Sequence, residues 1–430
     1  MKIYRTIPAL LLLIFFAAGQ PGFGYSVLTH QQIIDLAWKD SIRPVLLSRY
    51  PSTSEAELRR AQAFAYGGCA IQDAGYYPFG HEFFSELTHY VRTGDFVATL
   101  IRDSRNVDEL AFALGALSHY VGDSYGHQDA TNPSTAIEFP NLAAKYGPVV
   151  TYDESPHGHV RTEFAFDINQ LSKRRFAPSA YLQHIGLQVP ARLLEQAFFD
   201  TYGLDLRTMM TDRKVAIGSY RRAVRTFIPD FAYAEVLLHK KDFPDDLPSP
   251  EFDTFQKRLA DADFKNGWEK YRKKAGLRTH LLAFVILIVP KIGPMSYLAI
   301  RGPNQDTEQK YVASVNRTMD RYEQVLGELV KQPAGDPRVV MQLENRDLDT
   351  GYRVKPGSYP LTDKTYAELL DKLTKHGSPV PEELKQDIED YYSDPNAPIV
   401  TRKHKKAWAR VQKELAQLQT MPVVQVHAAE

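Results

Sequence analysis

Residues 107–127 read VDELAFALGALSHYVGDSYGH, and this stretch indicates both the fold class and the chemistry of the protein. Apolar residues fill its first turns at helical spacing and proline is absent, so residues 107–120 are predicted to form a buried helix. His119, Asp123 and His127 then recur every fourth residue and share one face if the helix continues. Buried imidazoles and carboxylates need partners, and a metal ion suits this set of side chains.

The rest of the sequence also shows helical periodicity, without the sustained alternation of apolar and polar residues that is typical of strands. Ser54 and Glu57 have the spacing of a capping box at the start of one predicted helix. We therefore expect an all-α protein. The predicted helices cover residues 31–45, 54–65, 107–120, 193–202, 213–238, 252–275, 306–331, 365–376 and 401–418.

The composition excludes one class of partner. The chain has 430 residues, and its 52 basic and 52 acidic residues give a formal net charge of zero. This balance argues against a nucleic-acid-binding surface built on bulk positive charge. Cys69 is the only cysteine, so an internal disulfide is impossible, and metal ions are the obvious source of added rigidity in an exported chain.

The N-terminus has the pattern of an export signal. Two basic residues precede a short apolar run over residues 9–18, which is too brief to span a bilayer comfortably. Gly22 and Gly24 place small residues at −3 and −1 of a cut before Tyr25, and a rival cut lies after Gly19. We expect a signal peptide over residues 1–24 and a secreted or periplasmic protein, with an uncleaved anchor as the alternative.

The chain is expected to divide into two parts. Residues 241–252 are rich in proline and aspartate and are predicted to link a domain over residues 25–240 to a mostly helical region over residues 253–430. In the second part, residues 281–300 (LLAFVILIVPKIGPMSYLAI) are strongly apolar, but two prolines and a lysine interrupt them. This segment is too broken for an ordinary spanning helix, so a buried core element and a membrane-contacting patch are the two interpretations.

A second pair of candidate ligands follows the first set. His159 and Glu163 stand four residues apart, which is helical spacing. Such a pair alone is common on surface helices, but beside the His119 set it becomes a strong candidate for metal binding. His157 competes with His159 for this role, and the spacing alone does not choose between them.

His30, Asp73 and His89 complete the candidate ligands. Asp73 lies in YGGCAIQDAGYYPFG, residues 66–80, a glycine-rich and aromatic stretch that predicts an exposed catalytic loop. A turn-capping aspartate is the alternative for Asp73. His81 is the rival of His89.

In this order, the motifs resemble those of the zinc-dependent phospholipase C superfamily, which includes bacterial phospholipases C, clostridial alpha-toxins, fungal zinc-dependent single-strand nucleases and animal glycosylphosphatidylinositol-specific phospholipase D. HYVGD over residues 119–123 is similar to the family's core motif. GHV over residues 158–160, followed by Glu163, is similar to its next motif and selects His159 over His157. The mature family protein begins with a tryptophan whose amine and carbonyl bind zinc; here Tyr25 of YSVLTH, residues 25–30, would take that place.

The resemblance implies an all-α domain with a cleft that holds three zinc ions. It covers residues 25–240, and residues 253–430 show no β-rich lipid-binding domain like that of alpha-toxin. It implies that Asp73, His89, His119 and Asp123 hold one ion, that Tyr25, His30 and a bridging Asp123 hold its close neighbour, and that His127, His159 and Glu163 hold the third.

One departure from the family bears on the substrate. The bacterial phospholipases and the nucleases place the next histidine six residues after the motif aspartate, with a proline between. Here His127 follows Asp123 by four residues without a proline, which is similar to the glycosylphosphatidylinositol-specific branch.

The expected function is that of a secreted zinc-dependent phosphodiesterase that cleaves a phospholipid or a related phosphoester. A close pair of zinc ions lowers the pKa of a shared water towards neutrality, and the resulting hydroxide attacks phosphorus. Asp73 can orient or deprotonate this water as well as ligate. The alternatives are a single-strand nuclease or nucleotidase with the same metals and a non-catalytic protein that zinc stabilises. Peripheral membrane contact through residues 281–300 is a further expectation, and nucleic acid is a partner only under the nuclease alternative.

Overall fold

Helix α7 (Val107–Gly126) lies at the centre of the molecule, which confirms the helix predicted from its sequence. The Asn106 side chain accepts hydrogen bonds from the backbone amides of Asp108 and Glu109 and so fixes the start of the helix. In this computed structural model, the described residues are 26–210, 212–239, 243–272, 282–284, 286–287, 302–333 and 341–425.

Helix α4 (Glu55–Gly68) packs along one side of α7, and two glycines allow a very close approach. A Cβ atom on Gly68 would lie 2.0 Å from the Phe112 carbonyl oxygen, and one on Gly115 would lie 2.2 Å from that of Ala65. The capping box is confirmed, because Ser54 accepts from the Glu57 amide and the Glu57 carboxylate accepts from the Ser54 amide.

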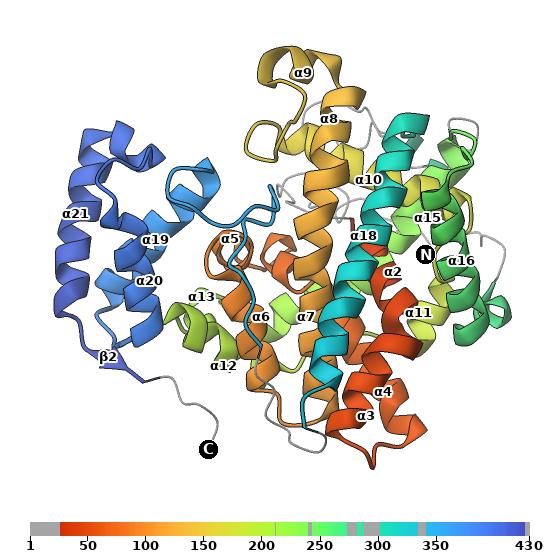
Figure 1. Cartoon of the computed structure of the whole chain (residues 1–430), viewed down its shortest axis with the longest axis horizontal. Coiled ribbons are helices and arrows are strands. Elements are labelled where there is room, and N and C mark those ends of the chain that lie inside the picture. The colour runs from red at the N-terminus through yellow and green to blue at the C-terminus, as the bar shows by residue number, and fades with distance from the viewer. Residues whose placement is uncertain are drawn as a thin grey trace, which may run out of the picture.

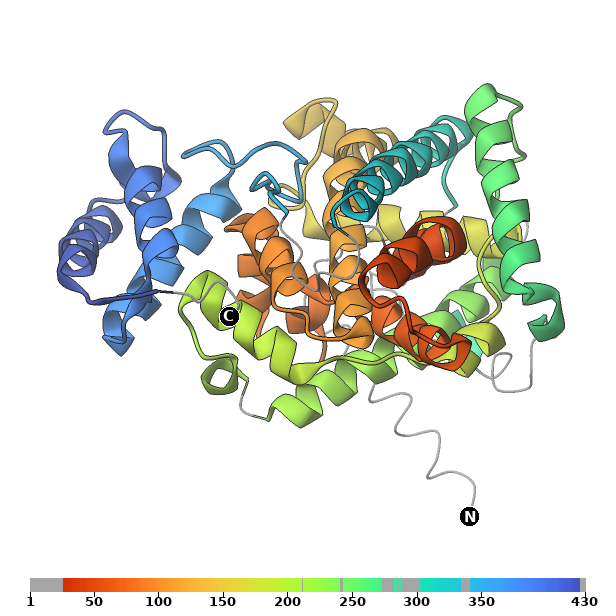
Figure 2. The same cartoon turned by 60° about the horizontal axis from the view of Figure 1, so that its bottom comes forward.

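Helix α18 (Gln305–Val330) lies beside α7 although almost two hundred residues separate them (Figures 1 and 2). The Tyr322 hydroxyl donates a hydrogen bond to the Leu114 carbonyl oxygen at 2.7 Å. One hydrophobic cluster runs from α4 and α7 into α18 and on to the C-terminal helices. The core is therefore continuous across residues 243–249, which have no regular secondary structure.

The described helices confirm the all-α class. Within the described residues, strands are limited to β1 (Val380–Pro381) and β2 (Val423–Val424), which pair in parallel. The helices around α7 are α2 (Val27–Ala37), α3 (Arg43–Arg49), α5 (Glu82–Tyr90), α6 (Thr93–Arg102), α8 (Asn132–Glu138), α9 (Pro140–Tyr146), α10 (Pro156–Ser172), α11 (Ser179–Ile185), α12 (Ala191–Tyr202), α13 (Leu206–Met209), α14 (Arg213–Arg222), α15 (Ile228–His239) and α16 (Pro250–Asn266). The last helices are α19 (Pro360–His376), α20 (Glu382–Ser393) and α21 (Lys405–Thr420).

Short π-helical and 3-10 turns account for several differences from the predicted helix bounds. The π turn η2 (Trp38–Ile42) joins α2 to α3, and η5 (Ala223–Phe227) joins α14 to α15. Helix α16 ends before its predicted bound because Gly267 takes φ +67°, a left-handed conformation that stops a helix. The remaining short turns are η3 (Gln72–Tyr76), η4 (His127–Thr131), η6 (Trp268–Tyr271) and η8 (Val400–Lys403).

The apolar segment 281–300 is described at only five positions. Ala283 and Ile286 are buried in a second hydrophobic cluster with residues of α10 and α15. Phe284 and Leu287, in contrast, are 57% and 64% exposed. Among the helices that the structure describes, none is long and apolar enough to cross a bilayer.

Candidate metal centre

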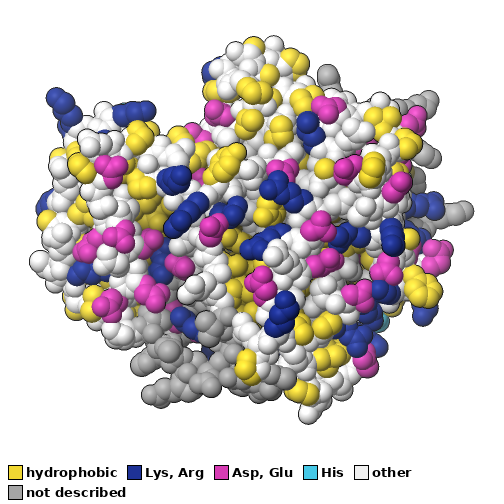
Figure 3. All heavy atoms as spheres, viewed as in Figure 1, with side chains coloured by type: hydrophobic (Ala, Val, Ile, Leu, Met, Phe, Trp, Pro, Cys, Tyr) yellow, Lys and Arg dark blue, Asp and Glu magenta, His cyan; other side chains and the backbone are white. Residues whose placement is uncertain are grey.

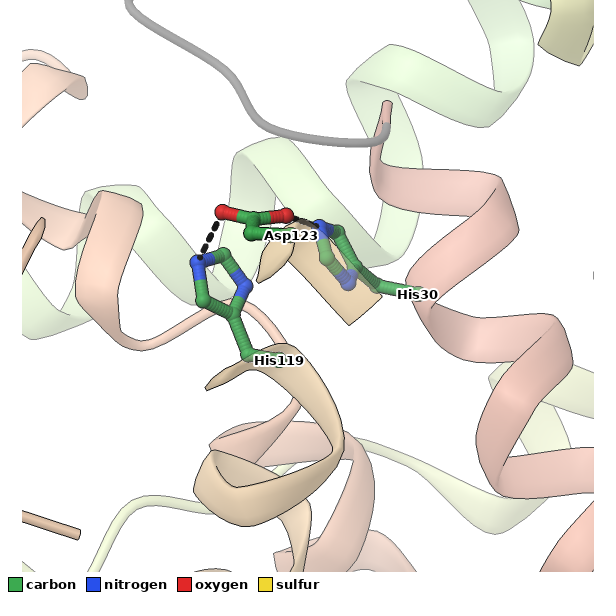
Figure 4. Close-up of side chains that lie close together, drawn as sticks. All are labelled: His30, His119 and Asp123. Carbon is green, nitrogen blue, oxygen red and sulfur yellow. Dashed lines mark ion pairs between the residues drawn. The ribbon is translucent and has the colours of Figure 1, made fainter. Parts of the chain in front are cut away.

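Asp123 lies between two imidazoles near the end of α7 (Figure 4). His30 Nε2, from α2, is 3.2 Å from Asp123 Oδ1, and His119 Nε2, one turn earlier on α7, is 3.0 Å from Asp123 Oδ2. All three side chains are fully buried. The two oxygens of one carboxylate therefore face two different imidazoles, as expected of a ligand that bridges two ions.

Asp73 and His89 lie next to this group. His89 Nε2, from α5, is 3.4 Å from Asp73 Oδ1 and 3.5 Å from Asp123 Oδ2. His119 joins both groups, since its Nε2 is 3.4 Å from that of His89. Ligand atoms of Asp73, His89 and His119 all lie within 4.8 Å of one another, a spacing at which a single ion can contact them.

The third group contains His127, His159 and Glu163. Helix α10 presents His159 and Glu163 on one face, with His159 Nε2 2.7 Å from Glu163 Oε1. His127, the first residue of the π turn η4, places its Nε2 3.2 Å from the same oxygen. These three side chains are also buried, and they form a second centre of converging nitrogen and oxygen atoms.

Backbone carbonyl groups orient three of the imidazoles. The Nδ1 atoms donate to carbonyl oxygens: His89 to Ser85 at 2.7 Å, His119 to Cys69 at 3.2 Å and His127 to Leu348 at 2.6 Å. A proton on Nδ1 leaves the Nε2 lone pair directed into the cluster. Such outer hydrogen bonds are typical of histidines that ligate metal ions.

The electrostatics of the cluster indicate a need for positive charge. Burial raises the pKa of Glu163 well above its ordinary value, and the negative charges of Asp123 and Asp73 raise it further. Burial alone would lower the pKa of His89, but hydrogen bonds to Asp123 and Asp73 and their charges raise it well above its usual range. Divalent cations would neutralise these gathered carboxylates.

The donor set fits zinc. Imidazole nitrogens and carboxylate oxygens are its usual ligands. Among the described residues, Asp73 Oδ2 and Glu163 Oε2 are buried without a hydrogen-bond donor. Buried oxygens of this kind normally have partners, so these atoms are well suited to a bound ion.

The structure brings together all the predicted ligands that it describes: His30, Asp73, His89, His119, Asp123, His127, His159 and Glu163. Tyr25, the remaining candidate, lies outside the described residues. Neither His81 nor His157 belongs to the described clusters. These clusters contain His89 and His159 instead, the two histidines that the motifs favoured.

One expectation about Asp73 is wrong. Its segment is not an exposed loop, because Asp73 is fully buried in the 3-10 turn η3. The backbone folds back on itself here: the Ser85 hydroxyl donates to the Gln72 carbonyl oxygen at 2.5 Å and accepts from the Gly75 amide at 2.9 Å. Within the same aromatic stretch, Phe79 is 63% exposed, whereas Tyr77 is buried.

Sequence reasoning missed two groups around the site. Asp167 of α10 accepts from the backbone amides of Leu28 and Thr29 at 2.9 and 3.2 Å, and so holds the first turn of α2 just before His30. Because Asp167 follows Glu163 by four residues, helical spacing could have placed it on the same face of α10. Asp349 Oδ1 lies 4.0 Å from His127 Nδ1, and no periodicity in the sequence pointed to it.

Residues 29–211 match the family model for zinc dependent phospholipase C. Among curated proteins and solved structures, none is significantly similar to the chain. The matched residues contain every described ligand candidate, from His30 to Glu163. The part of the chain that holds the cluster is therefore similar to the zinc-dependent phospholipases C, as its motifs predicted.

Proposed function

We propose that the protein is a secreted zinc-dependent phosphodiesterase that hydrolyses a phospholipid or a related phosphoester. The observation that carries this proposal is the set of adjoining buried clusters, in which Asp123 faces His30 on one side and His119 on the other. A single structural zinc site would need only four ligands, and this centre gathers about twice as many.

The chain offers ligands for three ions. Asp73, His89, His119 and Asp123 would hold the first, His30, Asp123 and the backbone of Tyr25 the second, and His127, His159 and Glu163 the third. Zinc ions in such sites lower the pKa of a bound water and neutralise charge on phosphoryl oxygens.

Asp73 is our candidate for the proton-handling residue. One oxygen of its buried carboxylate, Oδ1, lies 3.4 Å from His89 Nε2. The other, Oδ2, receives no hydrogen bond from the described residues, so it can accept a proton from the attacking water. Tyr76 follows Asp73 by three residues, and the centroid of its ring lies 6.0 Å from that of His89, at the edge of the cluster. We propose that this edge receives the substrate.

Export is part of the proposal and affects the metal site. A free α-amine at Tyr25 can ligate zinc, whereas the same nitrogen inside a peptide bond keeps its proton and cannot. Sequencing the N-terminus of the exported protein tests this point. A start at Tyr25 is expected, and a fully active protein that starts at Gln20 would contradict it.

The assay that tests the function compares three substrates for the zinc-loaded protein: phosphatidylcholine, phosphatidylinositol lipids and single-stranded DNA. Hydrolysis of either lipid supports the proposal. Cleavage of DNA alone would favour the nuclease, although Lys and Arg are interspersed with Asp and Glu on the face seen in Figure 3 rather than gathered in one basic patch. A zinc-loaded chain that cleaves none of these substrates would point to a non-catalytic role.

A lipid substrate also requires contact with a membrane surface. The apolar segment 281–300 is our candidate, because Phe284 and Leu287 expose their side chains while Ala283 and Ile286 are buried beside them. The chain has no net positive charge that would attract anionic lipids, so burial of such apolar side chains would have to supply the attraction.

A further inference from the structure

Residues 341–359, which precede α19, run beside α5 and α7 before they reach the C-terminal helices, as the light-blue trace shows (Figures 1 and 2). We call residues 344–359 the clasp. The clasp lies outside residues 29–211 and therefore outside the part of the chain that matches the family model.

The clasp touches two of the elements that carry candidate ligands. The Leu348 carbonyl oxygen accepts from His127 Nδ1 at 2.6 Å, and the Leu348 amide donates to the His89 carbonyl oxygen at 3.0 Å. Leu348 is fully buried. One residue of the clasp thus bonds to a histidine of each neighbouring cluster.

Asp349 is held from three sides beside His127. Its Oδ2 accepts from the hydroxyls of Tyr90 and Tyr359 at 2.9 and 2.7 Å, and its carbonyl oxygen accepts from the Asn132 side chain at 2.6 Å. The other carboxylate oxygen, Oδ1, is 4.0 Å from His127 Nδ1. These bonds fix both the backbone and the carboxylate next to the imidazole.

The path of the clasp leaves little freedom. Gly351 takes φ +72°, and a Cβ atom there would lie 2.0 Å from the carbonyl oxygen of Ser124, the residue after Asp123. One turn before Ser124 on α7, the Tyr120 hydroxyl donates to the Glu344 carbonyl oxygen at 2.6 Å. Asn345 Oδ1 accepts from the amides of Gly94 and Asp95 and so holds the start of α6.

We propose that the clasp positions the His127 imidazole for zinc and that Asp349 is a positioning residue for the ion held by His127, His159 and Glu163. The inference rests on the proposed zinc centre and gives the C-terminal region a part in it. The Leu348 carbonyl keeps the proton on Nδ1, so the Nε2 lone pair faces the cluster, and the Asp349 carboxylate lies beside Nδ1 and helps to hold the ring in this orientation.

The test measures how much zinc the full chain retains against a graded chelator, in the absence of substrate. Asp349→Asn keeps the shape of the side chain and removes its charge. We expect one zinc ion per chain to be released at a free-zinc concentration roughly 10- to 100-fold higher than in the wild type. Tyr352→Ser is the matched control, because this clasp side chain is 64% exposed and its zinc retention is expected to equal that of the wild type.

A double-mutant cycle separates positioning from general loosening of the fold. In a His127→Ala background, Asp349→Asn should have no further effect on zinc retention. An equal effect with and without His127, or no effect in the wild-type background, would overturn the proposal. Tyr359→Phe removes one donor to Asp349 with a smaller disturbance; if Asp349→Asn does not fold, a zinc release unchanged in Tyr359→Phe would overturn the proposal instead.

The experiment also distinguishes this inference from the proposed function. Zinc loss that depends on Asp349 in a chain that cleaves none of the substrates would support the clasp and contradict the enzyme. A wild-type chain that binds no zinc would overturn both.

Discussion

Helix α10 and the clasp meet at the same imidazole, His127, but they are built in different ways. The helix presents His159, Glu163 and Asp167 at four-residue intervals, so one regular structure places two ligands and the residue that holds α2. The clasp presents a carbonyl oxygen and a carboxylate from a segment without helix. This segment follows His127 by more than 200 residues in the chain. The comparison indicates that regular structure supplies the candidate ligands, while irregular structure orients at least one of them.

The largest effect is expected at Asp123, where the helical ligand sets meet. Asp123→Asn removes a charge that faces both His30 and His119, so two ions would lose a ligand at once. We expect activity on the preferred lipid to fall by more than the roughly 100-fold that loss of an outer hydrogen bond costs. Zinc content and turnover are the measurements.

Asp129→Asn is the matched control for this change. Asp129 follows on the next turn, where its carboxylate pairs with Arg317 near the surface at 2.7 Å. A surface pair of this kind contributes little to stability, so its variant should keep its zinc and its activity. Equal turnover and zinc content in both variants would refute the bridging role of Asp123.

Asp167→Ala sharpens the comparison because it tests an outer residue that belongs to the helix rather than to the clasp. The change removes the acceptor of the Leu28 and Thr29 amides and frees the first turn of α2. We expect a loss of about 1–2 kcal/mol in the free energy of unfolding, as for loss of a helix cap. Activity should fall roughly 10-fold or more because His30 follows directly. Denaturant unfolding and turnover check both parts, and unchanged turnover would show that α2 needs no such support.

The sequence predicted the helical half of this comparison and missed the clasp for a physical reason. Four-residue spacing in residues 119–127 and 159–163 is visible because a helix repeats, and the same rule could have reached Asp167. Leu348 acts through its carbonyl oxygen, which any residue possesses, so its side chain carries no signal. Asp349 depends on a long-range contact, and Asp73 was expected in an exposed loop because glycine-rich composition does not reveal the packing of α5 over it.

Asp35 lies on α2, the helix of His30, but is not itself a candidate ligand, and it allows a test of how stability depends on pH. Burial raises the pKa of Asp35 to about 8, although a hydrogen bond from the Tyr66 hydroxyl acts in the opposite direction. The folded state therefore keeps a proton that the unfolded state releases near pH 4. Stability should fall as the pH rises from about 4 to about 8, by at most about 1.4 kcal/mol per pH unit from this group. In Asp35→Asn this contribution should vanish, and an unfolding free energy with the same pH slope as the wild type would contradict the assignment.

The smallest effect on catalysis is expected in the apolar segment 281–300. Phe284→Asp with Leu287→Asp should weaken binding to phosphatidylcholine vesicles and leave turnover of a water-soluble phosphodiester unchanged, because both side chains are exposed. Ile286→Asp is the contrasting variant, since it places a charge in the core and should lower the yield of folded protein. Vesicle co-sedimentation decides the matter, and undiminished binding of the double variant would remove this segment from the membrane contact.

The central claim is that these helices build one zinc centre, and anomalous diffraction above and below the zinc edge tests it most directly. Crystals of the zinc-loaded protein should show zinc on both sides of the Asp123 carboxylate and a further ion among His127, His159 and Glu163, beside the clasp. Zinc at other places in the molecule, with no anomalous density at these residues, would contradict the account.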